Sequence, residues 1–100
     1  MCGRFTLTTS EEQIAAVLPG LVFSVQLPPR YNIAPTQDIA AVLNADPQTV
    51  QNVRWGLIPS WAKGAAIGNR MINARGETLH EKPSFKRPLQ KQRCLILADG

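Results

Sequence analysis

The sequence has few of the side chains that build metal sites and disulfide frameworks, with 2 cysteines and 1 histidine among its 100 residues. Cys2, Cys94 and His80 are too few for a convincing zinc site. A disulfide between the two cysteines is not expected in a reducing cytoplasm. We therefore predict a protein without a metal ion, a cofactor or a stabilising disulfide.

Long apolar segments are absent as well. No run approaches the roughly 20 residues that a transmembrane helix needs, and no basic start followed by an apolar stretch marks a signal peptide. The hydrophobic share of 44% nevertheless suits a folded protein. These features predict a cytoplasmic protein of one small domain with no membrane partner.

Acidic residues are in the minority, with 7 against 11 basic residues and a net charge of +4. The isoelectric point is correspondingly high, about 9.6. This balance favours a polyanionic partner but does not identify one, because many basic proteins bind no polyanion.

The pattern of apolar residues and turn residues predicts a β-rich α+β fold with mixed strands and short helices. Ser10 and Gln13 form a capping-box pattern, which predicts a helix over 10–18 that ends at Pro19-Gly20. The last strand is predicted to be buried, with Cys94 packed inside it. Strands are expected over residues 3–7, 39–43, 49–57 and 93–98.

Prolines mark the predicted breaks between these elements. The proline-rich segment 24–37 is expected to be an ordered loop, and Pro47 is expected to lie in the turn of a hairpin. Pro83 and Pro88 are expected to interrupt the stretch before the last strand. A surface loop and a helical turn are expected at 62–72 and 76–81. Because the chain stops directly after an apolar strand, we expect it to be a fragment of a longer protein.

Cys2 lies next to the initiator methionine, and removal of Met1 would place a free α-amine and a thiol on adjacent carbons. Both groups have reactive fractions near neutral pH. The amine can form a Schiff base with an aldehyde, and the thiol can then close a thiazolidine ring. A lysine or an internal cysteine lacks one of the two groups. The alternative is a cysteine that simply packs in the first strand.

Arg4 would share a face with Cys2 in a strand, because alternate side chains point the same way. A guanidinium there could hold a phosphate, and the alternative is a surface salt bridge. In the later proline-bounded segment, Asn32 offers an amide and Pro35 an apolar wedge against a base step. The alternative for this segment is an ordinary turn.

Trp55 alternates with apolar neighbours and is predicted to lie in the core. Trp61 follows the end of the strand, where it could stack on an unpaired base, although its position alone does not decide this. Asn73 and Arg75 have strand-like parity and could face one pocket together. There the amide could bond a sugar and the arginine could clamp a phosphate.

Five blocks occur in order along the chain: "MCGRF", "RYNIAPTQ", "WGLIPSW", "INARGET" and "RCLILADG". Together they resemble the SRAP family, the SOS-response-associated peptidase domain that processes abasic sites in DNA, over essentially the whole chain. The resemblance implies that residues 1–100 are the N-terminal part of a single SRAP domain. Family members continue past "ADG" and carry a catalytic glutamate and a later histidine, both expected beyond Gly100. His80 does not match that histidine.

The resemblance also implies a function. Members of the family shed Met1, bind single-stranded DNA at abasic sites and form a thiazolidine DNA–protein crosslink that shields the lesion. Cys2 then corresponds to the nucleophile and Asn73 to the active-site amide that orients the sugar. We expect a monomer that associates with the nucleoid when it is bound to DNA. The implied DNA contacts are Arg4, Asn32, Pro35, Trp61 and Arg75.

Three alternatives remain open. A cysteine-type peptidase or autopeptidase would also use Cys2 as its nucleophile, but the one histidine has no assigned place beside it. A glutamine amidotransferase with an N-terminal nucleophile can begin Met-Cys-Gly too, although the later blocks do not match that family. The chain could also be an inactive fragment of the SRAP domain.

Overall fold

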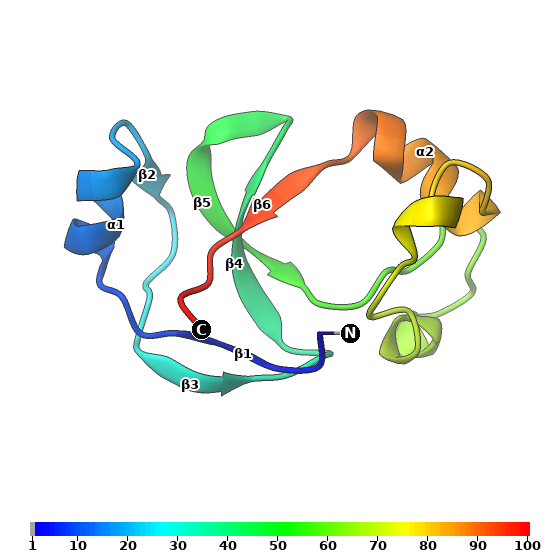
Figure 1. Ribbon diagram of the computed structural model, residues 1–100, viewed down its shortest axis with the longest axis horizontal. Helices are drawn as coiled ribbons and strands as arrows, with labels where there is room; N and C mark the ends of the chain where they lie inside the picture. The colour runs from blue at the N-terminus through cyan, green and yellow to red at the C-terminus, as the bar shows by residue number, and fades with distance from the viewer. Residues whose placement is uncertain (1) are drawn as a thin grey trace.

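The computed structural model describes residues 2–100, which form a four-stranded sheet, a separate two-stranded sheet and two α-helices (Figure 1). This mixed content confirms the predicted β-rich α+β fold. The strands are β1 (Phe5–Leu7), β2 (Val22–Phe23), β3 (Arg30–Ile33), β4 (Asp38–Leu43), β5 (Asp46–Arg54) and β6 (Cys94–Ile96). The α-helices are α1 (Glu11–Val17) and α2 (Pro83–Lys91), and two 3-10 turns, η1 (Ala65–Asn69) and η2 (Gly76–Thr78), lie between β5 and α2.

The larger sheet has the strand order β2-β5-β4-β6. β4 pairs antiparallel with both β5 and β6, and β2 pairs parallel with β5. In Figure 1 this sheet occupies the middle of the molecule, with α1 at one end and α2 at the other. The antiparallel pair β1–β3 crosses below it, and the C-terminus lies close to β1.

The core lies where β1 and β3 meet the β4–β5 hairpin. Ile33 and Val50 are the largest fully buried side chains, and Leu7, Ile39 and Val42 belong to the same cluster. Burying an aliphatic side chain of this size contributes roughly 1.5–3 kcal/mol. Core packing therefore anchors the strand that directly follows the N-terminal segment.

Helix α1 follows its predicted boundaries to within about a residue. The Ser10 amide donates to Gln13 Oε1 over 3.1 Å, and the Gln13 amide donates to Ser10 Oγ over 3.2 Å. This reciprocal pair satisfies two amides that a helix start otherwise leaves without partners. Ile14 is the buried residue of the helix.

Two predictions for the first half of the chain were wrong. The segment 24–37 is not all loop, because residues 30–33 form β3, whose partner β1 lies far away in the sequence. Pro47 lies inside β5 rather than in the hairpin turn. It falls at a shift in register, where Leu43 pairs with Asp46 but Val42 pairs with Val50. A bulge of this kind accommodates a residue that cannot donate a backbone hydrogen bond.

The prolines near the end do not interrupt regular structure, which corrects another expectation. Pro83 opens α2, where its missing amide hydrogen would have no helical partner, and Pro88 lies inside the helix. The last strand is also shorter and more exposed than predicted, since β6 covers only residues 94–96 and Cys94 is exposed. β6 is the edge strand and pairs with β4 alone, and all of its residues are exposed. Only Leu97, just beyond it, is buried.

Candidate functional site

Cys2 lies in an extended segment before β1 and is exposed. β1 begins at Phe5 rather than at residue 3, so the shared strand face expected for Cys2 and Arg4 is not formed. The one hydrogen bond of Cys2 Sγ within residues 2–100 is a long contact of 3.9 Å to the Arg4 carbonyl oxygen. The thiol is therefore open to solvent, and the alternative of a cysteine packed in the first strand does not hold.

Arg4 and Asn32 are brought together from segments far apart in the sequence. The Arg4 guanidinium donates to Asn32 Oδ1 over 3.2 Å, across the β1–β3 pair. The alternative of a surface salt bridge is therefore wrong, because the partner of Arg4 is a neutral amide. The pairing orients the guanidinium, and no salt bridge within residues 2–100 neutralises its positive charge.

Asp99 ties the C-terminal segment to β1 through a network that sequence reasoning missed. Its carboxylate accepts bonds from Thr6 Oγ1 at 2.6 Å, from Thr9 Oγ1 at 2.7 Å and from the Thr8 amide at 2.6 Å. These bonds favour the charged form and hold the pKa of Asp99 far below its ordinary value, with the Thr6 hydroxyl the largest cause. The Asp99 amide in turn donates to the Thr6 carbonyl over 2.9 Å. The strand after Cys2 is thus held at both its side chains and its backbone.

Trp55 links β1 to the segment that carries Asn73. Its ring packs against Phe5 of β1 with centroids 5.4 Å apart, and its Nε1 donates to the Ile72 carbonyl over 3.2 Å. It also packs against the core cluster, in line with the prediction for this residue. Trp55 therefore connects β1, which follows Cys2, to the residue that precedes Asn73.

The turns between β5 and α2 are held by a close backbone approach. Gly56 has φ of 132°, and a Cβ there would collide with the Gly68 carbonyl oxygen. The Leu57 amide donates to the Met71 carbonyl over 2.9 Å. These contacts keep η1 and residues 71–73 against the end of β5.

Asn73 and Arg75 line one hollow, which we call the Asn73 hollow. The segment that carries them is irregular and not a strand. The strand-like parity from which we predicted a shared pocket therefore does not explain why the two residues lie in it. Lys82 and Ser84, at the first turn of α2, contribute to the same hollow of about 390 Å³. An amide and cations therefore converge on a solvent-open cavity.

Pro35 is held at the tip of a constrained turn. The Gln37 amide donates to the Ala34 carbonyl, and Thr36 has φ of 75°, a conformation disfavoured for a β-branched residue. The Arg30 guanidinium also contacts the turn, since it donates a hydrogen bond to Gln37 Oε1 over 2.7 Å. These hydrogen bonds hold the turn, and Pro35 is half-buried at its tip.

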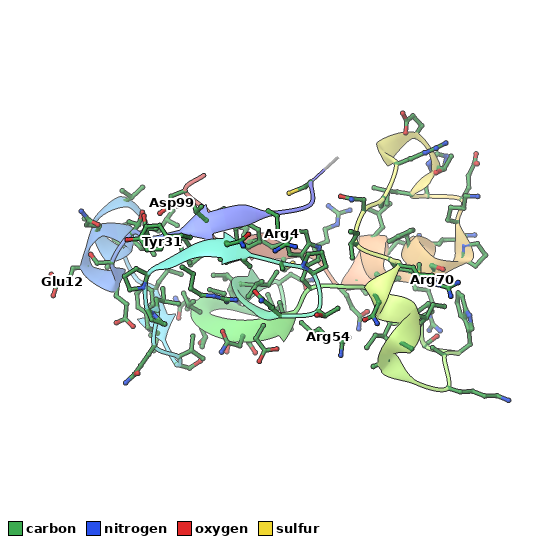
Figure 2. The ribbon with its side chains drawn as sticks, turned by 90° about the horizontal axis from the view of Figure 1, so that it is seen from below. Arg4, Glu12, Tyr31, Arg54, Arg70 and Asp99 are labelled. Atoms are coloured by element: carbon green, nitrogen blue, oxygen red, sulfur yellow. The ribbon has the colours of Figure 1, made fainter. Side chains whose placement is uncertain are left out.

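Charge is distributed unevenly over the molecule. In Figure 2, Arg4 and Arg54 lie over its middle and Arg70 lies toward the end that contains α2, whereas Asp99 and Glu12 lie toward α1. Sequence reasoning did not single out Arg54, which donates to Asn69 Oδ1 over 2.9 Å. A polyanion would therefore meet cations on the side of Arg4 and α2.

His80 lines neither the Asn73 hollow nor any other hollow described within residues 2–100. Its Nε2 lies 3.5 Å from a carboxylate oxygen of Glu81, and both side chains are exposed. Across residues 2–100, no group of at least three His, Cys, Asp or Glu side chains is arranged to hold a metal ion. No helix in that range is both long and apolar enough to cross a membrane.

Known proteins resemble this chain in sequence and in structure. The family model for SOS response associated peptidase (SRAP) matches residues 1–100. The chain is 47% identical to the abasic site processing protein YoaM of Bacillus subtilis and 46% identical to YoqW of the same organism, over 100% of this chain. The crystal structure of a protein from Bacteroides thetaiotaomicron superposes with a TM-score of 0.79 at 28% identity, over 95% of this chain and 45% of that one. The chain spans 45% of YoaM and 46% of YoqW.

Proposed function

Because the chain belongs to the SRAP family, we propose that it recognises abasic sites in single-stranded DNA and captures them covalently through Cys2. Residues 1–100 would be the N-terminal part of a single SRAP domain, and Met1, which lies outside the described residues, must first be removed. The relatives named abasic site processing proteins support this proposal. The observation that carries it is the exposed thiol of Cys2, next to an arginine whose charge is not neutralised.

The proposed reaction needs no oxidant or cofactor. The neutral α-amine of Cys2 adds to the aldehyde carbon of the opened abasic sugar, and loss of one water gives an imine. The Sγ atom then adds to the same carbon, and the imine nitrogen takes up the thiol proton. The ring that results holds the DNA through one C–N bond and one C–S bond.

The surrounding residues would hold the DNA for this step. Arg4 and Arg75 would contact phosphates, and the Asn73 amide would orient the sugar. Asn32 would position the Arg4 guanidinium, to which it is already bonded. Pro35 and Trp61 would contact the bases beside the lesion. A protein that binds abasic sites would act in the cytoplasm and on the nucleoid.

The test is adduct formation with single-stranded DNA that contains one abasic site. Protein lacking Met1 should give a heat-stable band on a denaturing gel, and its mass should equal protein plus DNA minus one water. Cys2→Ala should abolish this band. Cys94→Ala is the matched control, because Cys94 is also a free, exposed thiol but has no adjacent free amine.

The outcomes separate the remaining alternatives. An adduct that persists in Cys2→Ala, or one that depends on Cys94, would sink the thiazolidine proposal. Absence of any adduct from correctly processed protein would favour an inactive fragment. The peptidase alternative has no supporting contact, since within residues 2–100 no hydrogen bond joins His80 to Cys2.

A further inference from the structure

A second hollow, which we call the α2 groove, lies beside the Asn73 hollow and has a volume of about 420 Å³. Ile58 and Trp61 line one side, and they are 41% and 58% exposed. Ser84, Arg87 and Lys91 of α2 line the other. Their spacing places these three residues on one face of the helix.

The two hollows adjoin at the first turn of α2, where Pro83 and Ser84 line both of them. A ligand held at Asn73 therefore has the α2 groove beside it, on the other hollow that this turn lines. Asn73 and Arg75 line the first hollow, and the exposed indole ring of Trp61 lines the second.

Arg75, Lys82, Arg87 and Lys91 line the two hollows, and no Asp or Glu of the described chain lines either of them. Residues 82–98 contain 5 of the 11 Lys and Arg residues and no Asp or Glu. Several arginines elsewhere are hydrogen-bonded within the fold, including Arg4, Arg30 and Arg54. In the described chain, the side chains of Arg87 and Lys91 make no hydrogen bond or salt bridge.

We propose that the α2 groove binds the stretch of single-stranded nucleic acid that leaves the abasic site. An unpaired base stacks on Trp61, and Arg87 and Lys91 contact successive phosphates. Aromatic rings beside a cationic rim are the usual means of holding a single strand without reading its sequence. The course of the strand from the Asn73 hollow rests on the proposed function, but the binding chemistry of the groove does not.

The test uses a fluorescein-labelled oligothymidylate of about 12 residues, a length within the usual range of single-strand sites. It carries a tetrahydrofuran abasic analogue, which has no aldehyde, so fluorescence anisotropy measures binding without crosslinking. Trp61→Ala should weaken binding about fivefold or more. Lys91→Ala should also weaken it, and should lower the slope of log affinity against log salt by about 0.7, the value for one phosphate contact on a single strand.

Lys86→Ala is the matched control, because Lys86 is an exposed lysine of the same helix that lines neither hollow. It should leave affinity and salt slope close to those of the unmodified protein, and Lys91→Arg should restore both. A trinucleotide centred on the analogue should be insensitive to Lys91→Ala. Circular dichroism verifies that each variant is folded.

Equal losses in Lys86→Ala and Lys91→Ala would overturn the proposal, because they would reflect net charge alone. Tighter binding of a duplex than of the single strand would overturn it as well. If the protein binds the long probe through Lys91 but forms no adduct with aldehyde-bearing DNA, the proposed function fails and the groove proposal stands. If adducts form but Lys91→Ala has no effect on binding, only the groove proposal fails.

Discussion

Trp55→Phe tests whether this side chain couples β1 to the segment that carries Asn73. The phenyl ring can still pack against Phe5, but it cannot donate the 3.2 Å bond from Nε1 to the Ile72 carbonyl. Removing one partner of a part-buried hydrogen bond costs roughly 1–3 kcal/mol, and the smaller ring also buries less apolar area. The free energy of unfolding should therefore fall by about 2 kcal/mol.

Urea denaturation followed by circular dichroism measures this loss as a shift in the transition midpoint. Trp61→Phe is the matched control for stability, because Trp61 is 58% exposed and should change by no more than about 0.5 kcal/mol. Adduct formation by folded Trp55→Phe should also be slower, even at saturating DNA, since Asn73 directly follows Ile72. Equal stability losses in the two variants, or an unchanged rate at saturation, would refute the coupling.

Two further predictions concern the contacts that hold β1 and η1. Hydrogen bonds from Thr6 and its neighbours lower the pKa of Asp99 in the folded protein. The charged Asp99 side chain therefore stabilises the fold fully at pH values above its ordinary pKa of 3.8, and this stabilisation is lost progressively as the pH falls below 3.8. Asp99→Asn should lower the melting temperature at neutral pH and reduce the further drop on acidification to about pH 2; an equal drop in both proteins would count against this role. Gly56→Ala should destabilise by about 2 kcal/mol or more, because it combines strain at φ of 132° with a collision at Gly68. In chemical denaturation Gly64→Ala should be nearly neutral, since nothing lies within 4 Å of its added Cβ, and similar losses at both glycines would contradict this explanation.

Local signals predicted the elements that depend on local chemistry. The capping box predicted the start of α1, and the continuous apolar run at residues 39–43 predicted β4. Pairing between distant segments was harder to predict, because β3 has no strong pattern of its own and exists through its register with β1. The predictions for Pro47 and Pro83 were wrong for a related reason. A β-bulge and the first turn of a helix are both positions where no backbone N–H is needed, so a proline can occupy them within regular structure.

In the candidate site, too, some features could be predicted from local sequence and others depend on contacts between distant segments. Residue types and motif order suggested candidate site residues, and the structure brings Arg4 to Asn32 and places Asn73 and Arg75 in one hollow. Asp99 lies within the block "RCLILADG", but the block does not reveal its role, because that role depends on threonines about 90 positions away in the sequence. The only local hint was the cluster of threonines after Phe5.

The position of the Cys2 thiol is itself a long-range property. β1 is 3 residues long, too short to be stable without tertiary contacts. It is held by pairing with β3, by Asp99 near the other end of the chain and by the contact between Phe5 and Trp55. Each of these contacts acts on residues 5–9 and none on Cys2, so the thiol is carried by an anchored strand while remaining exposed. A substitution far from Cys2 in sequence can therefore alter where the thiol meets a ligand without altering the chemistry of the thiol.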